Sequence, residues 1–183
     1  MQSIDFEAGA VANLRRRVAE VEEINEDLVA FARGHAGAVT SIHNAVLAAI
    51  AATDISELLS ILTFDWPALL KVDQVALVWS CDGKAFRTDL IGTTPVEPRL
   101  VGRMVETLPS VTIRPVEQGH PLFGTLGGEV RSEALIRLSG DRGCGLLALG
   151  QLEGGSAEGR HGTRLLRFLG QALSHMLERC TTL

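Results

Sequence analysis

The sequence predicts an α+β protein in which an antiparallel sheet of about five strands is flanked by helices, after a separate N-terminal helix. Three observations predict it: a heptad pattern near the start, helical patterns on both sides of the centre, and short β-type runs between them. The 183 residues suffice for one domain with an appendage. We therefore divide the chain into an N-terminal helix over residues 1–36 and a globular domain over residues 37–183.

The N-terminal segment has apolar residues at alternating steps of three and four, as a coiled-coil seam requires. Asn25 falls at a core position, where a buried amide pairs with its copy in a parallel two-stranded coil. The opposite face is charged and is expected to be solvated. The alternative is a single amphipathic helix packed on its own domain. The positions predicted to form the dimer contact are Val11, Leu14, Val18, Val21, Asn25 and Leu28.

Two further helical runs open the globular domain. The first is predicted from Val39 to Ala51. Asp54 with Glu57 three residues later has capping-box spacing and predicts the start of the second. We expect Pro67 to divide that second helix, because proline removes a helix hydrogen bond.

The rest of the domain reads as strands with two more helices. Val75–Trp79 and Lys84–Ile91 flank Asp82-Gly83, a hairpin dipeptide, and predict two antiparallel strands. A connection punctuated by Pro95 and Pro98 follows. The remaining predicted elements are a helix over Leu100–Leu108, an edge strand over Val111–Val116, strands over Ala134–Leu138 and Leu146–Leu149, and a final helix from Thr163.

Charge and hydropathy limit the kinds of partner that the protein is expected to have. The net charge is −5, from 17 basic and 22 acidic residues, which disfavours a nucleic-acid binder. The longest aliphatic stretch, Ala45–Ala52, has eight residues, far short of the roughly 20 that span a bilayer. No signal peptide is visible at the acidic start. We expect a cytoplasmic protein without a membrane partner; an anionic ligand near Arg114, Arg131 or Arg137 is compatible with the charge distribution.

Five strings along the chain carry a family resemblance: Leu122-Phe-Gly124, Ser132–Leu138, Gly145–Gly150, Gly162-Thr163 and Phe168-Leu-Gly170. Their order resembles domain-of-unknown-function family 484, an uncharacterised bacterial family, and the order of the elements resembles the GAF/PAS-like class of regulatory domains. The resemblance implies a GAF-like fold and no established activity.

GAF-like domains commonly hold a small ligand between one sheet face and the crossing helix and loops. By that resemblance, the expected ligand-binding residues are Trp79, Phe86, Met104, Arg114, His120 and Phe123. The alternative is a core that side chains fill, with no ligand.

Enzyme chemistry has one candidate. Some GAF-fold proteins are thiol-dependent reductases of methionine sulfoxide, and the GAF-like order places Cys81 and Cys144 at the same end of the sheet. The third thiol, Cys180, completes no disulfide framework. Histidine spacing predicts no metal site, and no cofactor is expected. Gly124–Gly128 lacks the Lys-Ser/Thr of a phosphate loop and is expected to be a flexible connection.

Together these features predict a non-enzymatic, homodimeric, cytoplasmic sensor or adaptor module of GAF-like fold. Its expected partners are a second copy, an unidentified small molecule and a protein that receives the signal. The open alternatives are the thiol reductase and a scaffold without ligand.

Overall fold

The structure is a computed structural model that describes residues 15–18, 34, 36–153 and 160–181. The chain divides into two compact units, residues 1–37 and 38–183. In the first unit residues 15–18 are helical, and Val18 is exposed. The other five positions predicted for the dimer contact lie outside the described residues.

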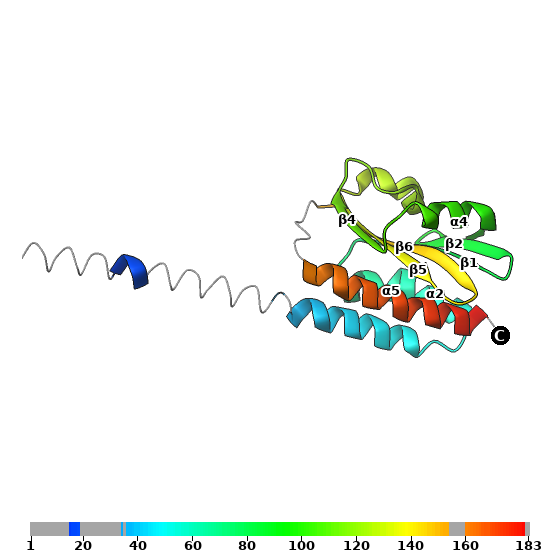
Figure 1. The fold of residues 1–183 in the computed structure, drawn as a ribbon, viewed down its shortest axis with the longest axis horizontal. Coiled ribbons are helices and arrows are strands. Elements are labelled where there is room, and N and C mark those ends of the chain that lie inside the picture. The colour runs from blue at the N-terminus through cyan, green and yellow to red at the C-terminus, as the bar shows by residue number, and fades with distance from the viewer. Residues whose placement is uncertain (1–14, 19–33, 35, 154–159, 182–183) are drawn as a thin grey trace, which may run out of the picture. The chain divides into compact units, whose positions relative to one another are not determined.

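The second unit is built on one six-stranded antiparallel sheet with the strand order β3-β2-β1-β6-β5-β4 (Figure 1). Its strands are β1 Gln74–Cys81, β2 Lys84–Asp89, β3 Gly92–Pro95, β4 Val111–Pro115, β5 Ser132–Ser139 and β6 Gly143–Gln151. The order confirms β4 as an edge strand. It also confirms the hairpin between β1 and β2, where Asp82 and Gly83 both adopt positive φ.

The prediction of about five strands missed β3. This short strand pairs only with β2 and begins and ends with Gly and Pro, residue types that strands avoid. The preceding strand was correspondingly predicted too long. It ends at Asp89, and Leu90 and Ile91 form the turn into β3.

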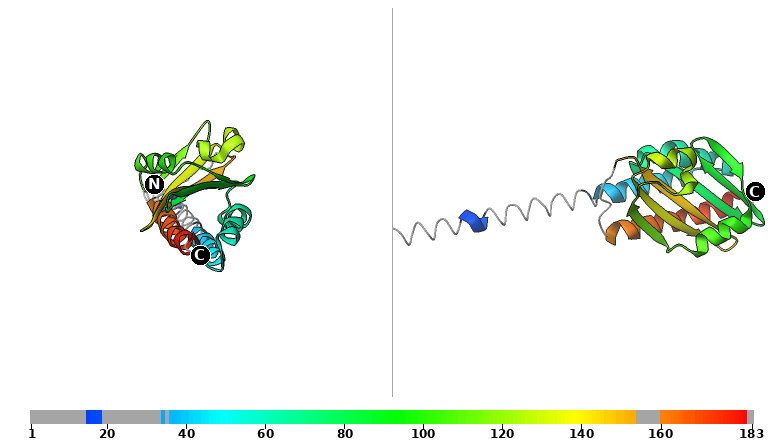
Figure 2. Two further views of the ribbon diagram at one scale, coloured as in Figure 1. Left: turned by 90° about the vertical axis from the view of Figure 1, so that its right-hand side faces the viewer. Right: turned by 90° about the horizontal axis from the view of Figure 1, so that it is seen from above.

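Helices cover both faces of the sheet (Figure 2). Helix 36–50, which belongs to this unit from residue 38, lies with α2, η1, α3 and α5 on one face, and α4 and η2 lie on the other. Their bounds are α2 Ile55–Ser60, the π-helical η1 Ile61–Asp65, α3 Trp66–Leu70, α4 Pro98–Glu106, the 3-10 helix η2 Pro121–Glu129 and α5 Arg160–Thr181.

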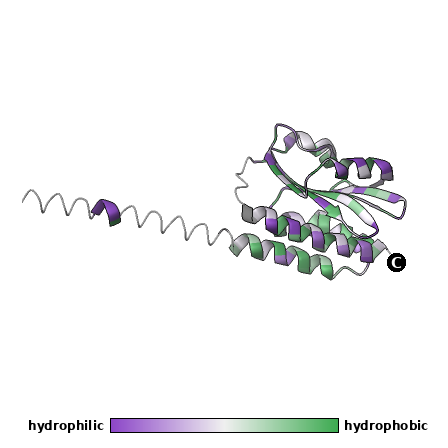
Figure 3. Cartoon of the chain, viewed as in Figure 1, coloured by the Kyte–Doolittle hydropathy of each residue, from purple (hydrophilic) through white to green (hydrophobic). Residues whose placement is uncertain are grey.

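Alternating strand residues feed two separate cores. Along β1, Val75, Leu77 and Trp79 pack toward helix 36–50, α2 and α5, whereas Ala76 and Val78 pack toward α4 and η2. Figure 3 shows green, apolar residues both in the strands and in the helices that cover them. The sheet therefore presents two chemically similar faces with different covers.

The start of α2 confirms the predicted cap at Asp54, and Glu57 reaches back to Thr53, one residue before the cap. The Asp54 carboxylate accepts from the Glu57 N–H at 2.8 Å, and the Glu57 carboxylate accepts from the Thr53 N–H at 2.8 Å. One helix-end donor, the Glu57 N–H, is thereby satisfied, together with the N–H of the residue before the cap.

The helix that begins with α2 is interrupted just before Pro67, as predicted. In the π-helical turn η1 the Trp66 N–H bonds to the Ile61 carbonyl, five residues back. Pro67 has no N–H to continue the regular ladder. The buried Trp66 Nε1 donates to the Ala45 carbonyl at 3.0 Å, which ties α3 to helix 36–50.

The prediction of a flexible glycine-rich connection was wrong. The segment forms η2, with Leu122 and Phe123 buried against the sheet. His120 caps it, since its Nδ1 accepts from the Leu122 N–H at 3.2 Å, and Arg87 Nε donates to the Leu122 carbonyl at 3.0 Å. Glycine is needed at Gly124, where φ is +62°.

Candidate functional site

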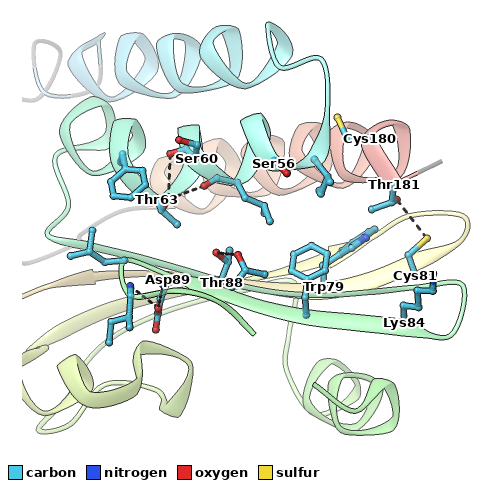
Figure 4. A pocket seen from close by; sticks show the side chains of 18 of the residues that line it. Ser56, Ser60, Thr63, Trp79, Cys81, Lys84, Thr88, Asp89, Cys180 and Thr181 are labelled. Carbon is cyan, nitrogen blue, oxygen red and sulfur yellow. Dashed lines mark hydrogen bonds between the residues drawn. The ribbon is translucent and has the colours of Figure 1, made fainter. Parts of the chain in front are cut away.

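A cavity of about 860 Å³ opens between the α2–η1 segment and strands β1, β2 and β3 (Figure 4). It exists because the cover of this face is uneven. The long helix α5 packs on β4, β5 and β6, which leaves the β1–β3 half to the short α2 and η1. Small-molecule sites usually measure about 300–1,000 Å³. We call this cavity the groove.

One wall of the groove is apolar. Trp79 and Phe86 are register partners on β1 and β2 and share the face toward α2. At the mouth, Phe64, Leu90 and Ile91 are 63%, 56% and 71% exposed. Large apolar side chains gathered at a cavity entrance are typical of binding sites.

Hydroxyl groups line the groove from both sides. Ser56, Ser60 and Thr63 come from α2 and η1, and Thr88 of β2 lies across the cavity from them (Figure 4). Thr93 of β3 also lines it. The last two hydroxyl oxygens lie 2.9 Å apart in a cross-strand hydrogen bond. The groove is therefore amphipathic, with hydrogen-bonding groups set among apolar side chains.

Trp79 forms the floor and carries an unused donor. Its side chain is fully buried, and Nε1 has no hydrogen-bond partner among the described residues. The indole lies against β6, where a Cβ added to Gly143 would overlap Cζ2 and one added to Gly145 would lie 3.0 Å from Cε3. An unpaired buried N–H costs roughly 1–3 kcal/mol.

Of the charged side chains beside the groove, two carboxylates form ion pairs within the chain and one lysine does not. Asp82 pairs with Arg142, whose hydrogen bond lowers the pKa of that carboxyl. Asp89 pairs with Arg87 and also accepts from the Ile91 N–H at 2.9 Å. Lys84, by contrast, is exposed and forms no ion pair with another described residue. The uncommitted charge at the groove is therefore positive.

The structure does not bring the six predicted ligand residues together. Trp79 and Phe86 line the groove. Met104 and Phe123 pack in the core on the opposite face. The sheet separates the two groups, so these four side chains do not line one pocket between a sheet face and its covering helix and loops, as was expected.

The other two predicted residues, Arg114 and His120, belong to a clamp on a buried carboxylate. Glu133 has no exposed side-chain surface. Its Oε1 accepts from Arg114 Nη2 at 2.8 Å and Nε at 2.9 Å, and its Oε2 accepts from the His120 N–H at 2.6 Å. Burial lowers the pKa of His120, opposed by the Glu133 charge. These contacts fasten η2 to the end of β5.

The other arginines considered for an anion also bond to acceptors of the chain itself. Arg131 Nη1 donates to the carbonyls of Glu117, Gly128 and Val130, at 3.1, 2.8 and 3.1 Å. Arg137 Nη1 donates to the Leu108 carbonyl at 3.4 Å. Their positions point to loop fastening rather than to a shared anion site.

The two cysteines of the reductase alternative lie at the same end of the sheet, as predicted, but on opposite faces. Cys144 pairs with Ser80, the neighbour of Cys81, and successive strand residues point to opposite sides. Cys81 lines the groove and Cys144 packs against the other core. Burial raises the pKa of the Cys144 thiol, whereas a reactive thiol needs a lowered one. This geometry offers no disulfide without rearrangement.

Sequence reasoning missed most of the groove. Its helical side is marked by hydroxyl residues at steps of four and three, Ser56, Ser60 and Thr63, inside an otherwise apolar run. Its floor is marked by a tryptophan on β1 and the Gly143-x-Gly145 pattern on β6. Both patterns are visible in the sequence. That they belong to one cavity is visible only in the folded chain, where the pairing of β1 with β6 also places Trp79 beside Gly143 and Gly145.

The described part of the chain contains neither a membrane-spanning helix nor a metal-binding cluster. None of the described helices is long and apolar enough to cross a membrane. Within residues 15–18, 34, 36–153 and 160–181, no three His, Cys, Asp or Glu side chains gather in a way that could hold a metal ion.

The family described as "Protein of unknown function, DUF484" matches residues 1–182. This chain belongs to the DUF484 family. The match confirms the resemblance drawn from the five strings. No curated protein matches the DUF484 chain.

Solved structures show that the fold of this DUF484 protein is that of a GAF domain. It is similar to the GAF domain of a phosphoenolpyruvate-protein phosphotransferase from Coxiella burnetii, with a TM-score of 0.56, 14% identity, and coverage of 81% of this chain and 96% of that one. The corresponding Acinetobacter domain gives 0.52 at 15% identity, covering 78% and 93%.

A third similar structure is the chromophore-binding domain of Stigmatella aurantiaca bacteriophytochrome. Its TM-score is 0.51 at 17% identity, with 75% of this chain covered. The match spans 59% of the length of that domain. At these identities the likeness concerns the fold alone.

Proposed function

We propose that this DUF484 protein is a non-enzymatic, homodimeric GAF-like sensor or adaptor of the cytoplasm that binds a small molecule in the groove. The observation that carries the proposal is a cavity of about 860 Å³ whose lining includes the fully buried Trp79, with an indole N–H that has no partner among the described residues. A cavity of this size with a few polar groups among apolar walls is the usual form of a ligand site.

The groove selects for one class of ligand. Trp79 and Phe86 favour a flat apolar body, and the Trp79 donor favours a carbonyl or similar acceptor. Both carboxylates beside the groove are already paired, and Lys84 is the uncommitted charge. The expected ligand is therefore a flat, mainly apolar molecule that carries an acceptor or an anionic group.

Ligand binding would act on helix 36–50 through the two elements that hold its end. Arg179 of α5 donates to the carbonyls of Ile50 and Ala52, at 3.2 and 3.0 Å. The next two residues of α5, Cys180 and Thr181, line the groove, as does the start of α2. A ligand that prefers one arrangement of α2 and α5 would shift the position of this helix.

The dimeric part of the proposal is supported by the heptad seam of the first unit, with Asn25 at a core position. The sensory part is supported by the kinds of protein whose domains have a similar fold. Its similar structures include domains of a phosphotransferase and of a bacteriophytochrome, the latter described as chromophore-binding. That support is analogy of fold, and the groove supplies the independent argument.

The test compares small molecules released from the purified full chain and from two variants. Ser56→Trp fills the groove from an exposed position of α2. Thr94→Trp is the matched control: it is exposed on β3 but outside the groove, one residue from Thr93. Each protein is purified, denatured, and its released compounds are measured by mass spectrometry.

We expect one compound, flat and mainly apolar, in near-stoichiometric amount with the wild type and Thr94→Trp, and at least about tenfold less with Ser56→Trp. Absence of any such compound from all three proteins contradicts the sensor and favours the scaffold. Equal retention by Ser56→Trp places the ligand elsewhere and contradicts the groove.

A further inference from the structure

We propose that the groove binds a single-tailed amphiphilic acid, with a flat anionic head beside Lys84 and an apolar tail that reaches the mouth at Leu90 and Ile91. The inference rests on the proposed function and names the class of ligand for the same site. Its basis is a difference between the two ends of the groove. One end carries charge, the other exposes apolar side chains, and an aromatic pair lies between them.

Strand β2 sets the length of the groove. The lining residues of this wall run from Lys84 to Leu90, the first residue after the strand. Six residues of a strand cover about 20 Å. A volume of about 860 Å³ over that length gives a mean cross-section of about 40 Å². The groove is therefore long and narrow, and it suits an elongated ligand better than a compact one.

One end of the groove carries a positive charge that forms no ion pair with another described residue. Lys84 is the register partner of Cys81, and both line this end together with Thr181 (Figure 4). The acidic lining residue at this end, Asp82, is paired with Arg142. An anionic group placed beside Lys84 would meet a cation without displacing an ion pair of the chain.

The charged lining residue at the opposite end is Asp89. Its side chain is only 9% exposed and pairs with Arg87. Its Oδ1 also accepts from the N–H groups of Ile91 and Gly92, at 2.9 and 3.3 Å. These bonds hold the carboxylate in the turn between β2 and β3. The lining of this end therefore offers no partner to a second charged group of a ligand.

The turn at this neutral end has an unusual composition. Leu90 and Ile91 form the two-residue connection between β2 and β3. Such turns favour Gly, Asn and Asp. Here two large aliphatic side chains are 56% and 71% exposed instead. Turn formation gives no reason for either of them, whereas an apolar tail that leaves the groove would cover both.

Phe64 borders the same mouth from the helical wall. It is 63% exposed and belongs to the π-helical turn η1, a kind of turn that occurs frequently at functional sites. Large apolar side chains from two different elements thus meet at one entrance. A mouth of this composition favours an apolar chain over a polar one.

The aromatic pair lies nearer to the charged end, and this order sets the direction of the ligand. On β2, Phe86 is two residues from Lys84, about 7 Å along the strand, and four residues from Leu90, about 13 Å. Trp79 is the register partner of Phe86. A flat head beside this pair therefore has its anionic group within reach of Lys84, and its tail extends along the strand to the mouth.

The test uses four probes: benzoate, para-butylbenzoate, para-octylbenzoate and the uncharged para-butylbenzamide. Each is titrated into the full chain by isothermal titration calorimetry, below its critical micelle concentration. The octyl chain extends toward the mouth, and the butyl chain ends short of it. We expect para-octylbenzoate to bind at least about tenfold more tightly than para-butylbenzoate, because each buried methylene group adds a favourable transfer free energy.

The charged end is located by Lys84→Gln. This variant should bind all three acids about two- to fivefold more weakly and should bind para-butylbenzamide as the wild type does. Lys71→Gln is the matched control, since Lys71 is exposed and lies outside the groove.

The apolar end is located by Ile91→Ser. This variant should bind para-octylbenzoate at least about threefold more weakly and should leave the affinities for benzoate and para-butylbenzoate unchanged. Leu100→Ser is its control, because Leu100 is 53% exposed on α4, on the opposite face of the sheet. Circular dichroism checks that these exposed substitutions leave the fold intact.

The outcomes separate this inference from the proposed function. Equal affinities for the butyl and octyl acids, an equal response of both to Ile91→Ser, or unchanged acid affinities in Lys84→Gln would each overturn the amphiphilic acid. If a compound released from the wild type is nevertheless lost from Ser56→Trp, the groove stands as a site for another class of ligand. Absence of any released compound, together with no binding of the four probes, overturns both.

Discussion

The two faces of the sheet carry similar strand residues, but one face is packed against its helices and the other contains the groove. On the α4–η2 face, Ala76 and Val78 of β1 are covered by Leu122 and Phe123, and that face is closed. On the other face α5 closes the β4–β6 half, and the β1–β3 half opens into the groove. The contrast arises from the cover: on this half the sheet is covered by the short α2–η1 segment, which lines the groove with Ser56, Ser60 and Thr63 among apolar side chains. One sheet thus carries a packing face and a face for binding.

The largest expected effect separates the two faces by stability. Phe123→Ala removes a buried ring from the closed face and should lower the free energy of unfolding by about 3–5 kcal/mol. Phe86→Ala removes a half-buried ring that borders the groove, so its loss should be at most about half as large. Urea denaturation measures both. Equal losses would break the distinction between a closed and an open face.

A smaller effect concerns charge at the groove. The planar aromatic anion 8-anilinonaphthalene-1-sulfonate matches the ligand class inferred for it. Lys84→Gln should weaken binding of this probe by about two- to fivefold, since an exposed ion pair contributes at most about 1 kcal/mol. Lys71→Gln is the control, because Lys71 is exposed and lies outside the groove. Fluorescence titration gives both affinities, and an equal response of the two variants would remove Lys84 from the site.

The smallest effect belongs to the closed face and depends on pH. Burial lowers the pKa of His120 in the fold, so the unfolded chain takes up the proton first as the pH falls below about 6.5. Stability is therefore lost as the pH drops through that value, and the loss levels off below the folded pKa. Protonation would also remove the Nδ1 acceptor of the Leu122 N–H.

His120→Asn keeps a side-chain acceptor for that N–H but does not titrate. Between pH 7.5 and 5.5 the wild type should lose more unfolding free energy than this variant, as followed by urea denaturation at each pH. Parallel pH profiles for the two proteins would show that His120 contributes nothing to the acid sensitivity.

The difference between the two faces also explains which features could be predicted from the sequence. Strong periodicity found the helices, and Asp54 with Glu57 located the start of α2. The strings that carried the family resemblance include Phe123, Leu135 and Leu146, which are buried core residues of the closed face. They therefore identified the fold and said little about binding.

The groove depends on relations that no local pattern contains. Trp79 and Phe86 were named by the GAF-like resemblance, and the register of β1 and β2 places both at the groove. Phe123 was grouped with them wrongly, because only the folded chain shows that η2 crosses the opposite face. The π-helical turn before Pro67 and the short strand β3 complete the groove, and both depend on tertiary packing more than on propensity.

The most direct measurement of the central claim uses the two tryptophans. Trp66 Nε1 donates to the Ala45 carbonyl, and Trp79 Nε1 has no partner among the described residues. Protein labelled with nitrogen-15 is titrated with 8-anilinonaphthalene-1-sulfonate, and the two indole N–H signals are followed by NMR, with Trp66→Phe to assign them. The account predicts that the Trp79 signal moves with saturation while the Trp66 signal stays. Binding that leaves the Trp79 signal in place, or that moves only the Trp66 signal, would contradict a ligand site in the groove.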